Sequence, residues 1–309
     1  MATHILESQQ FDKETLFNIF KDADRLRQAI AEKKILNDLN GKILTTLFYE
    51  PSTRTRFSFE SAMNRLGGKV ISTENAGEFS SASKGESLED SIRVIAKYAD
   101  CIVLRHPAEG SAHNASLVSQ APIINAGDGK GQHPTQALLD VYTIQQELKK
   151  IDGIKIAMVG DLASGRTVRS LCYLLGKFDN VEIVFVSPEH LRMKDDIKEY
   201  LQRHNVKFSE ESDLNKVLPE VDVVYMTRIQ KERLSIEDYE KARGKYVIND
   251  ENIKLIKEDG IIMHPLPHVE EINLHIDIEN KDKRVAYFRQ AENGLYIRMA
   301  LLNMVIGSE

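Results

Sequence analysis

The sequence predicts an α/β protein with two similar-sized domains, each a parallel sheet flanked by helices. Short apolar runs alternate with segments of helical periodicity, which is typical of parallel β/α units. The alternation starts anew after the polar stretch 145–153, and the 309 residues amount to about twice an average domain of ~150 residues. We therefore expect a first domain at residues 1–134, a second at residues 135–291, and a C-terminal helix, 292–309, that packs back on the first domain.

The first domain is expected to begin with a helix and to continue with four strands. Asp12 is a suitable N-cap, and the apolar residues after it follow helical spacing: Leu16, Ile19, Phe20, Ala23, Leu26 and Ile30. Short apolar runs predict strands at 43–48, 70–71, 101–104 and 123–124. The polar stretch 74–86 is rich in Ser and Gly and is expected to form a loop.

The second domain repeats this pattern of strands and helices. Apolar runs predict strands at 154–159, 181–186, 221–226 and 261–263. The final segment, 295–306, is apolar on nearly every side, which is typical of a helix packed between other elements. We expect this helix to brace the two domains.

Charge and cysteine content exclude several classes of protein. Lys and Arg (41) against Asp and Glu (47) give a net charge of −6, so neither nucleic acid nor an anionic membrane is an expected partner. Cys101 and Cys172 lie far apart in apolar segments, so neither a disulfide framework nor a zinc site is expected. Residues 1–20 interleave charges with apolar residues and no run of ~18 apolar residues occurs, so we predict a cytoplasmic protein.

The loop after the first strand carries an unusual group of polar residues. In parallel sheets, ligands bind beyond the carboxyl ends of the strands. Here the residues that open the next helix are Ser52, Thr53, Arg54, Thr55 and Arg56. Free N–H groups at a helix start, hydroxyl donors and a forked guanidinium together make a receptor for phosphate. The alternative is a plain helix cap at Ser52 with solvated arginines, and the spacing alone leaves both open.

Two further loops, which follow strands of the first domain, carry candidate ligand-binding residues. Arg105 follows the strand at 101–104, and His133 and Gln136 open the helix that follows the strand at 123–124. Taken singly, such a histidine is more often a structural hydrogen-bonding residue and such an arginine a surface charge. Because parallel strands end at the same edge of a sheet, their convergence there favours a ligand site.

The second domain begins with a near match to a nucleotide-binding loop. Residues 160–167 read G-D-L-A-S-G-R-T, close to the phosphate-loop pattern G-x-x-x-x-G-K-[ST]. Arg166 stands in place of the lysine, and a planar guanidinium suits a carboxylate better than nucleotide phosphates. A nucleotide-binding protein is therefore kept as an alternative from a different class.

The remaining loops of the second domain suggest an acidic ligand that also has an amide or amine. Arg228 and Gln230 follow the strand at 221–226, so two arginines point to a doubly acidic ligand. The strand at 261–263 leads into H-P-L-P, where prolines remove backbone donors and leave the carbonyls of Pro265 and Leu266 free to accept. A rigid turn is the alternative there.

With F-Y-E-P-S-T-R-T at 48–55, H-P-T-Q at 133–136 and H-P-L-P at 264–267, the chain resembles the carbamoyltransferase family over nearly its whole length. T-R-I-Q at 227–230 and the proline after His264 resemble the members that use aspartate; ornithine-type members would carry Ser-Met-Gly and Cys there. The resemblance implies transfer of the carbamoyl group from carbamoyl phosphate to L-aspartate, in de novo pyrimidine biosynthesis. An ornithine-type acceptor is the alternative.

The resemblance also assigns roles to the matching residues. The phosphate would be bound by Ser52, Thr53, Arg54 and Thr55. The carbamoyl oxygen would be polarised by Thr55, Arg105 and His133, which with Arg54 form the catalytic set. The carbamoyl amide would bind Gln136 and the carbonyls of Pro265 and Leu266. Aspartate would be bound by Arg166, Arg228, Gln230 and Leu266.

The family also implies an assembly and a motion. Ser80 and Lys84 would enter the active site of a neighbouring subunit, so a homotrimer is the smallest competent unit. Glu50 would bridge toward Arg166 and Arg233, which implies domain closure on the substrates. Separate regulatory chains or a dihydroorotase as further partners stay open.

The chemistry of carbamoyl transfer agrees with these residues. Attack of a neutral amine on the carbamoyl carbon develops negative charge on its oxygen, where each fixed donor contributes ~3 to 4 kcal/mol. We expect no covalent nucleophile, metal or organic cofactor, and His133 is expected to act as a donor rather than a general base. A trimeric scaffold without activity is a third possibility, and the intact set of polar residues argues against it.

Overall fold

The computed structural model describes residues 4–79, 81–229 and 235–307. The chain divides into two compact units, Met1–Leu138 with Asn293–Glu309, and Leu139–Glu292. The divisions fall inside two helices, α6 (Pro134–Leu148) and α12 (Tyr287–Ile306). Each unit contains a parallel sheet with flanking helices, so the predicted fold class is confirmed.

The first unit is built on a four-stranded parallel sheet with the strand order β2-β1-β3-β4. The strands are β1 (Ile43–Phe48), β2 (Lys69–Glu74), β3 (Cys101–His106) and β4 (Ile123–Asp128). In the register of the sheet, Phe48 lies opposite both Glu74 and Arg105. The carboxyl ends of β2, β1 and β3 are therefore level with one another.

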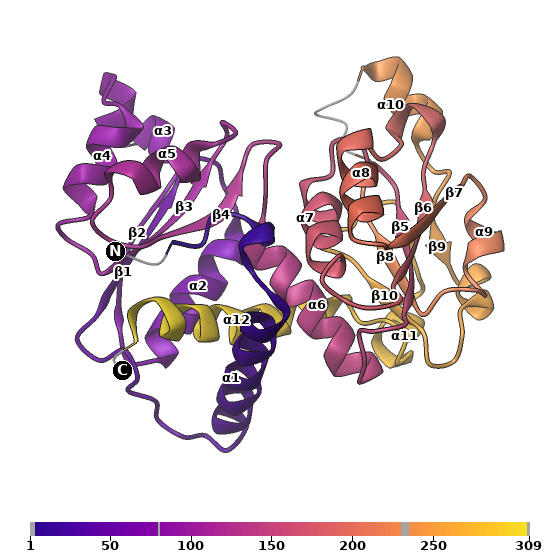
Figure 1. The fold of residues 1–309 in the computed structure, drawn as a ribbon, viewed down its shortest axis with the longest axis horizontal. Coiled ribbons are helices and arrows are strands. Elements are labelled where there is room, and N and C mark those ends of the chain that lie inside the picture. Colours follow the sequence, from indigo (N-terminus) through magenta and orange to yellow (C-terminus); the bar gives the residue numbers. More distant parts are fainter. Residues whose placement is uncertain (1–3, 80, 230–234, 308–309) are drawn as a thin grey trace. The chain divides into compact units, whose positions relative to one another are not determined.

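Helices cover both faces of this sheet (Figure 1). They are α1 (Lys13–Ala31), α2 (Thr53–Arg65), α3 (Ala76–Phe79), α4 (Leu88–Ile95) and α5 (Ser111–Val118). Ile92 of α4 and Ala112 of α5 share a buried cluster with Leu104 of the sheet. Asp12 caps α1 as predicted, because its carboxylate accepts the Thr15 N–H at 2.7 Å.

The C-terminal helix α12 packs on the first unit, as predicted. The Arg298 guanidinium lies 5.2 Å from the centre of the Phe59 ring of α2, and the Asn303 amide donates to Asp22 of α1 at 3.3 Å. The helix begins at Tyr287, before the predicted residue 292, because polar residues such as Gln290 hide the apolar pattern of its first turns. Gln290 is nevertheless buried.

The second unit contains a five-stranded parallel sheet with the order β10-β8-β5-β6-β7. Its strands are β5 (Lys155–Val159), β6 (Glu182–Val186), β7 (Lys207–Glu211), β8 (Val223–Met226) and β10 (Ile261–Met263), and β9 (Ile248–Asn249) pairs separately with β11 (Ile272–Asn273). The helices are α7 (Arg166–Leu175), α8 (Asp195–Arg203), α9 (Leu214–Val217), α10 (Ile236–Ala242) and α11 (Ile276–Lys281).

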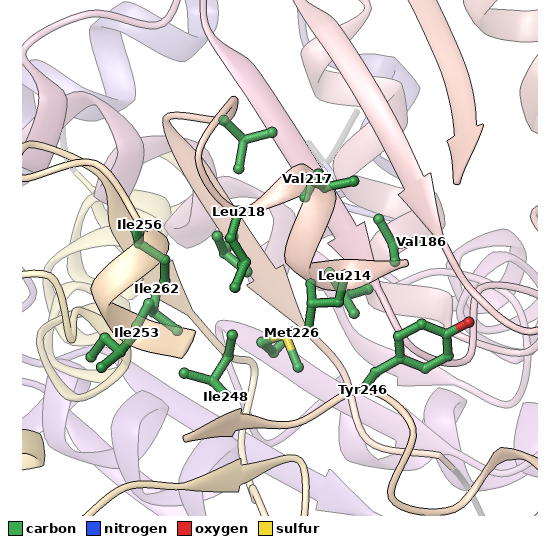
Figure 2. Close-up of a cluster of buried hydrophobic side chains, with 14 of the residues drawn as sticks. Val186, Leu214, Val217, Leu218, Met226, Tyr246, Ile248, Ile253, Ile256 and Ile262 are labelled. Carbon is green, nitrogen blue, oxygen red and sulfur yellow. The ribbon is translucent and has the colours of Figure 1, made fainter. Parts of the chain in front are cut away.

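Apolar side chains cover both faces of the second sheet. Figure 2 shows one face, where Met226 and Ile262 from the strands meet Leu214 and Leu218. On the other face, the Cys172 thiol of α7 lies 3.5 Å from the sulfur of Met158 in β5. Burial on both faces explains why the interior strands of this sheet appear as apolar runs in the sequence.

One predicted segment differs from the structure, and edge strand β7 was not predicted. The stretch 74–86 is not an irregular loop, because it contains α3 and a 3-10 helix at Ser81–Lys84. Local hydrogen bonds stabilise this turn: the Asn75 amide donates to the Glu78 carboxylate at 2.7 Å. Strand β7 was not predicted, because it lies at the edge of its sheet and its sequence, KFSEE, has the charges of an exposed edge.

No helix in the described part of the chain is long and apolar enough to cross a membrane.

Candidate active site

The start of helix α2 presents unpaired backbone donors at the carboxyl edge of the first sheet. The first intrahelical bond joins the Arg56 N–H to the Ser52 carbonyl, so the N–H groups of residues 53–55 have no partner within the helix. The Ser52 side chain makes no capping hydrogen bond. The interpretation of Ser52 as a plain side-chain cap is therefore wrong, and its hydroxyl remains available for a ligand.

The two arginines of this helix start have different surroundings. The Arg56 guanidinium lies 3.2 Å from the Glu74 carboxylate and donates to the Ser72 hydroxyl at 3.2 Å. Glu74 in turn accepts the Ser52 N–H at 3.1 Å, so Arg56 supports the loop. Arg54 forms no ion pair with any described residue, and partial desolvation lowers its pKa with no carboxylate to offset that effect. Arg54 is thus the cation that this loop offers to an anion.

Arg105 is held at the same edge of the sheet. Its guanidinium lies 2.9 Å from the Glu50 carboxylate and donates to the Ala126 carbonyl at 3.2 Å. Its backbone carbonyl also accepts the Tyr49 N–H at 2.9 Å, which ties the end of β3 to the loop after β1. The expected bridge from Glu50 toward Arg166 and Arg233 stays a prediction, and Arg233 lies outside the described residues.

His133 and Gln136 lie at the start of α6, where both are buried. The His133 carbonyl accepts the Gln136 N–H at 3.0 Å, so His133 caps the helix through its backbone. The loop before them is held by Asp128, a residue that sequence reasoning missed. Its carboxylate accepts the Gln132 N–H at 2.9 Å and the Gly110 N–H at 3.0 Å. The G-D-G segment around it was its only signal in the sequence.

Arg166, Arg228 and the segment 264–267 lie at one edge of the second sheet. They follow β5, β8 and β10, which are neighbours in the sheet, and Val159 lies opposite Met226 in the register. Arg166 is the first residue of α7. Gln230, which was predicted to act with Arg228, lies outside the described residues.

The loop after β5 differs physically from a nucleotide-binding loop. Asp161 is fully buried in it and accepts the Ser164 N–H at 2.9 Å. This backbone donor is thus used by a carboxylate of the same loop, and the carboxylate would repel a phosphate. The arrangement disfavours the nucleotide-binding alternative.

The backbone of 264–267 leaves two carbonyls available. Among the residues that the structure describes, none donates a hydrogen bond to the carbonyl of Pro265 or Leu266. Leu266 has φ +53°, a left-handed conformation that is disfavoured for a residue with a side chain. Such a conformation persists only where surrounding groups hold it, and it is common in ligand-binding segments.

Ser80 and Lys84 are the residues predicted to complete the active site of a neighbouring subunit. Lys84 is exposed at the end of the 3-10 helix Ser81–Lys84, whereas Ser80 lies outside the described residues. The role of both residues in a second subunit stays a prediction.

Two family models match the chain. The carbamoyl-P binding domain of aspartate/ornithine carbamoyltransferase matches residues 3–146, and the Asp/Orn binding domain matches residues 152–305. Among similar proteins, aspartate carbamoyltransferase 1, chloroplastic, of Pisum sativum is 56% identical over 304 residues, which cover 98% of this chain and 78% of the relative. The aspartate carbamoyltransferase catalytic subunit of Methanocaldococcus jannaschii is 52% identical over 304 residues, which cover 98% of this chain and 97% of the relative.

Solved structures agree with these matches. The catalytic subunit of M. jannaschii aspartate transcarbamoylase superposes with a TM-score of 0.90 at 51% identity, covering 98% of this chain and 97% of the other. Aspartate transcarbamoylase from Trypanosoma cruzi in complex with carbamoyl phosphate and aspartate gives a TM-score of 0.93 at 40% identity. The match covers 99% of this chain and 97% of the other.

Proposed function

The chain belongs to the aspartate/ornithine carbamoyltransferase family, and we propose that it transfers the carbamoyl group of carbamoyl phosphate to the amine of L-aspartate. The products are N-carbamoyl-L-aspartate and phosphate. The observation that carries this proposal is that Arg54, which pairs with no carboxylate among the described residues, lies beside the N–H groups of residues 53–55, which have no partner within α2, in a chain 52% identical to an aspartate carbamoyltransferase catalytic subunit.

The first unit supplies the carbamoyl phosphate site. Ser52, Thr53, Arg54 and Thr55 bind the phosphate, whose negative charge is favoured at a helix N-terminus. Thr55, Arg105 and His133 donate to the carbamoyl oxygen, and Gln136 binds the carbamoyl amide. Supporting this assignment, Glu50 and Ala126 fix the Arg105 guanidinium before any substrate binds.

The second unit supplies the acceptor site. Arg166, Arg228 and Gln230 bind the two carboxylates of aspartate, and the carbonyls of Pro265 and Leu266 accept from the amide or amine. A guanidinium pairs well with a carboxylate and repels an ammonium group. Ornithine would place its side-chain ammonium where aspartate places a carboxylate, so this site disfavours an ornithine-type acceptor.

The reaction is then a direct displacement, in which fixed charges of the protein position the substrates and stabilise the charge that develops. The aspartate amine attacks the carbamoyl carbon, the C–N bond forms, and the bond from that carbon to the phosphate oxygen breaks with its electron pair on that oxygen. The proton that the amine nitrogen must lose passes to the leaving phosphate. Charge that develops on the carbamoyl oxygen is stabilised by Thr55, Arg105 and His133, and the leaving phosphate by Arg54. Positioning of both substrates supplies the remaining rate enhancement.

We also propose a cytoplasmic homotrimer in which Ser80 and Lys84 complete the site of a neighbouring subunit. The exposed position of Lys84 supports this assignment. The relative from M. jannaschii is named a catalytic subunit, so an assembly with separate regulatory chains fits the proposal. A role in pyrimidine biosynthesis follows from the product.

The proposal is tested by measuring phosphate release from carbamoyl phosphate with L-aspartate, with L-ornithine and with neither amine. We expect release with aspartate only, and a particle mass of three chains by light scattering on the same sample. Release with ornithine would favour the other branch of the family. Thermal stabilisation by ATP and magnesium without transferase activity would favour the nucleotide-binding alternative.

A further inference from the structure

His264 is a buried histidine whose ring contacts the backbone of the proposed acceptor site. Only 2% of its surface is exposed. Its Nδ1 accepts the Leu266 N–H at 2.8 Å, and its Nε2 lies 2.8 Å from a carboxylate oxygen of Glu271. Glu271 is also buried. Both ring nitrogens therefore have defined partners.

These two contacts fix the protonation of the ring. A ring nitrogen that accepts a hydrogen bond carries no proton, so the single proton of the neutral ring lies on Nε2 and is donated to Glu271. A second proton on Nδ1 would break the bond to Leu266. The ring can hold the Leu266 N–H only in this neutral form.

The segment depends on this bond because it has few other donors. Pro265 and Pro267 carry no N–H, so His264 and Leu266 contribute the two N–H groups of residues 264–267. The His264 N–H donates to the Gln290 side chain at 2.8 Å. The Leu266 N–H therefore anchors the left-handed turn, and the His264 ring is the acceptor that holds it.

A second buried chain of hydrogen bonds supports the same segment. The Gln290 amide, which accepts from the His264 N–H, donates to Asp140 at 2.6 Å. Tyr225 of β8 donates to the other oxygen of Asp140 at 2.7 Å. The position of the histidine backbone is thus fixed from the sheet and from α6, and its ring then fixes Leu266.

We infer that His264 is a positioning residue, which as the neutral Nε2–H tautomer aims the carbonyls of Pro265 and Leu266 at the carbamoyl amide. The inference rests on the proposed function for the identity of that ligand. It assigns to His264 a role in binding carbamoyl phosphate without contact with the substrate.

The surroundings of the ring favour its neutral form. Among described residues, the titratable or charged groups that face it are Glu271, His268 and Arg228. Burial lowers the pKa of His264 and outweighs the hydrogen bond to Glu271, while Arg228 and His268 lower it further. Burial raises the pKa of Glu271, but the hydrogen bond from His264 and hydrogen bonds from backbone N–H groups lower it more. The pKa of Glu271 is therefore below its ordinary value.

The test separates the two ring nitrogens by substitution. In His264→Asn the amide oxygen replaces Nδ1 and can still accept the Leu266 N–H. In His264→Gln the amide nitrogen replaces Nε2 and can donate to Glu271, but the acceptor for Leu266 is lost. His268→Gln is the matched control, because that ring packs 6.1 Å from the His264 ring and makes no bond to the segment 264–267 that the structure describes.

The first measurement is the KM for carbamoyl phosphate at saturating aspartate. We expect His264→Gln to raise it at least about tenfold, His264→Asn no more than about threefold, and His268→Gln to leave it close to wild type. Inhibition by inorganic phosphate should change little in all three, because phosphate binds at the α2 start. Equal KM values for the Asn and Gln variants would overturn the inference.

The second measurement does not depend on activity. Hydrogen exchange of a peptide spanning 260–272, followed by mass spectrometry, should show faster exchange in His264→Gln than in His264→Asn or wild type. Should wild type fail to carbamoylate aspartate, the proposed function is wrong, and the exchange still tests the anchoring of Leu266. If His264→Gln does not fold, Glu271→Ala replaces it, and an unchanged KM in that variant would overturn the inference.

Discussion

Arg54 and Arg56 are two residues apart, yet their partners predict opposite effects of mutation. Arg56 is paired with Glu74 and bonded to Ser72, whereas Arg54 pairs with no described carboxylate. We expect Arg54→Ala to lower kcat at least about 10²-fold, because a fixed charge on the leaving phosphate is lost. Its thermal midpoint should stay near that of wild type. The measurement is steady-state kinetics with differential scanning calorimetry.

Arg56→Ala is the matched control for this prediction. Removal of one partner of a half-buried ion pair should cost about 1 to 3 kcal/mol of unfolding free energy, so its thermal midpoint should fall. Retained turnover in Arg54→Ala, or a larger loss of stability in Arg54→Ala than in Arg56→Ala, would show that the two roles are assigned wrongly.

At this scale, the sequence predicted which residues gather at the strand ends but not how each is used. Arg54 and Arg56 are equivalent in the pattern S-T-R-T-R, and they are distinguished mainly by the contacts of Arg56 with the distant residues Ser72 and Glu74. The same holds for Asp128 and Glu271, whose partners are set by loop geometry. A lone acidic residue in a loop gives at most a weak signal in a sequence, such as the two glycines that flank Asp128.

At the scale of the structural elements, the geometry of the turn after β5 predicts that Gly160 cannot be replaced without loss of stability. Gly160 has φ +116°, and a Cβ built on it would lie 2.3 Å from the Thr227 carbonyl oxygen. Gly153 in the same unit has φ +74° with nothing within 4 Å of its Cβ. We expect Gly153→Ala to cost about 1 kcal/mol of unfolding free energy, and Gly160→Ala at least about 2 kcal/mol more.

The Gly160→Ala variant should also weaken aspartate use, because the Thr227 backbone that it displaces leads directly into Arg228. Urea unfolding of both variants, together with the KM for aspartate, tests this. Similar stabilities of the two variants would mean that the turn after β5 relaxes without moving β8.

Strands could be predicted from the sequence where both of their faces are buried. The interior strands β5, β6 and β8 are almost entirely apolar, so their positions followed from the sequence. Edge strand β7 and the turn at α3 were not predictable in this way, because exposed strands and single helical turns depend on neighbours and local hydrogen bonds. The order of the strands in each sheet was likewise not predicted.

For the molecule as a whole, the parallel topology brings motifs that are far apart in the sequence together at one edge of each sheet. In each unit, loops that are far apart in sequence lie at the ends of neighbouring strands, because β1, β3 and β4 are adjacent in one sheet and β10, β8 and β5 in the other. The prediction of one site at each sheet edge required only that the strands be parallel. The choice of acceptor needed the family resemblance and the relatives that share it.

The stability of the whole chain should fall as the pH drops below about 6.5, because three histidines are held neutral in the folded state. Burial lowers the pKa of His4, His106 and His264, and in each ring Nδ1 accepts a backbone N–H. Above the pKa that these histidines have in the unfolded chain, they are neutral in both the folded and the unfolded state, so the free energy of unfolding is unchanged. Below it, the unfolded chain takes up protons first, so the free energy of unfolding decreases until the folded pKa is reached.

Thermal midpoints between pH 8 and pH 5 measure this loss, and a substitution identifies its source. Oδ1 of an asparagine at position 106 could accept the Ala108 N–H and would not titrate, so His106→Asn should flatten the slope between pH 7 and pH 5. Exposed His113 provides the control, since His113→Asn should leave that slope as in wild type. An unchanged slope in His106→Asn would show that His106 is not a source of this loss, and would leave the loss to His4 and His264. Carboxylates such as Asp282, whose pKa is lowered chiefly by its hydrogen bond with Arg284, cannot account for it, because their contribution is lost only at lower pH.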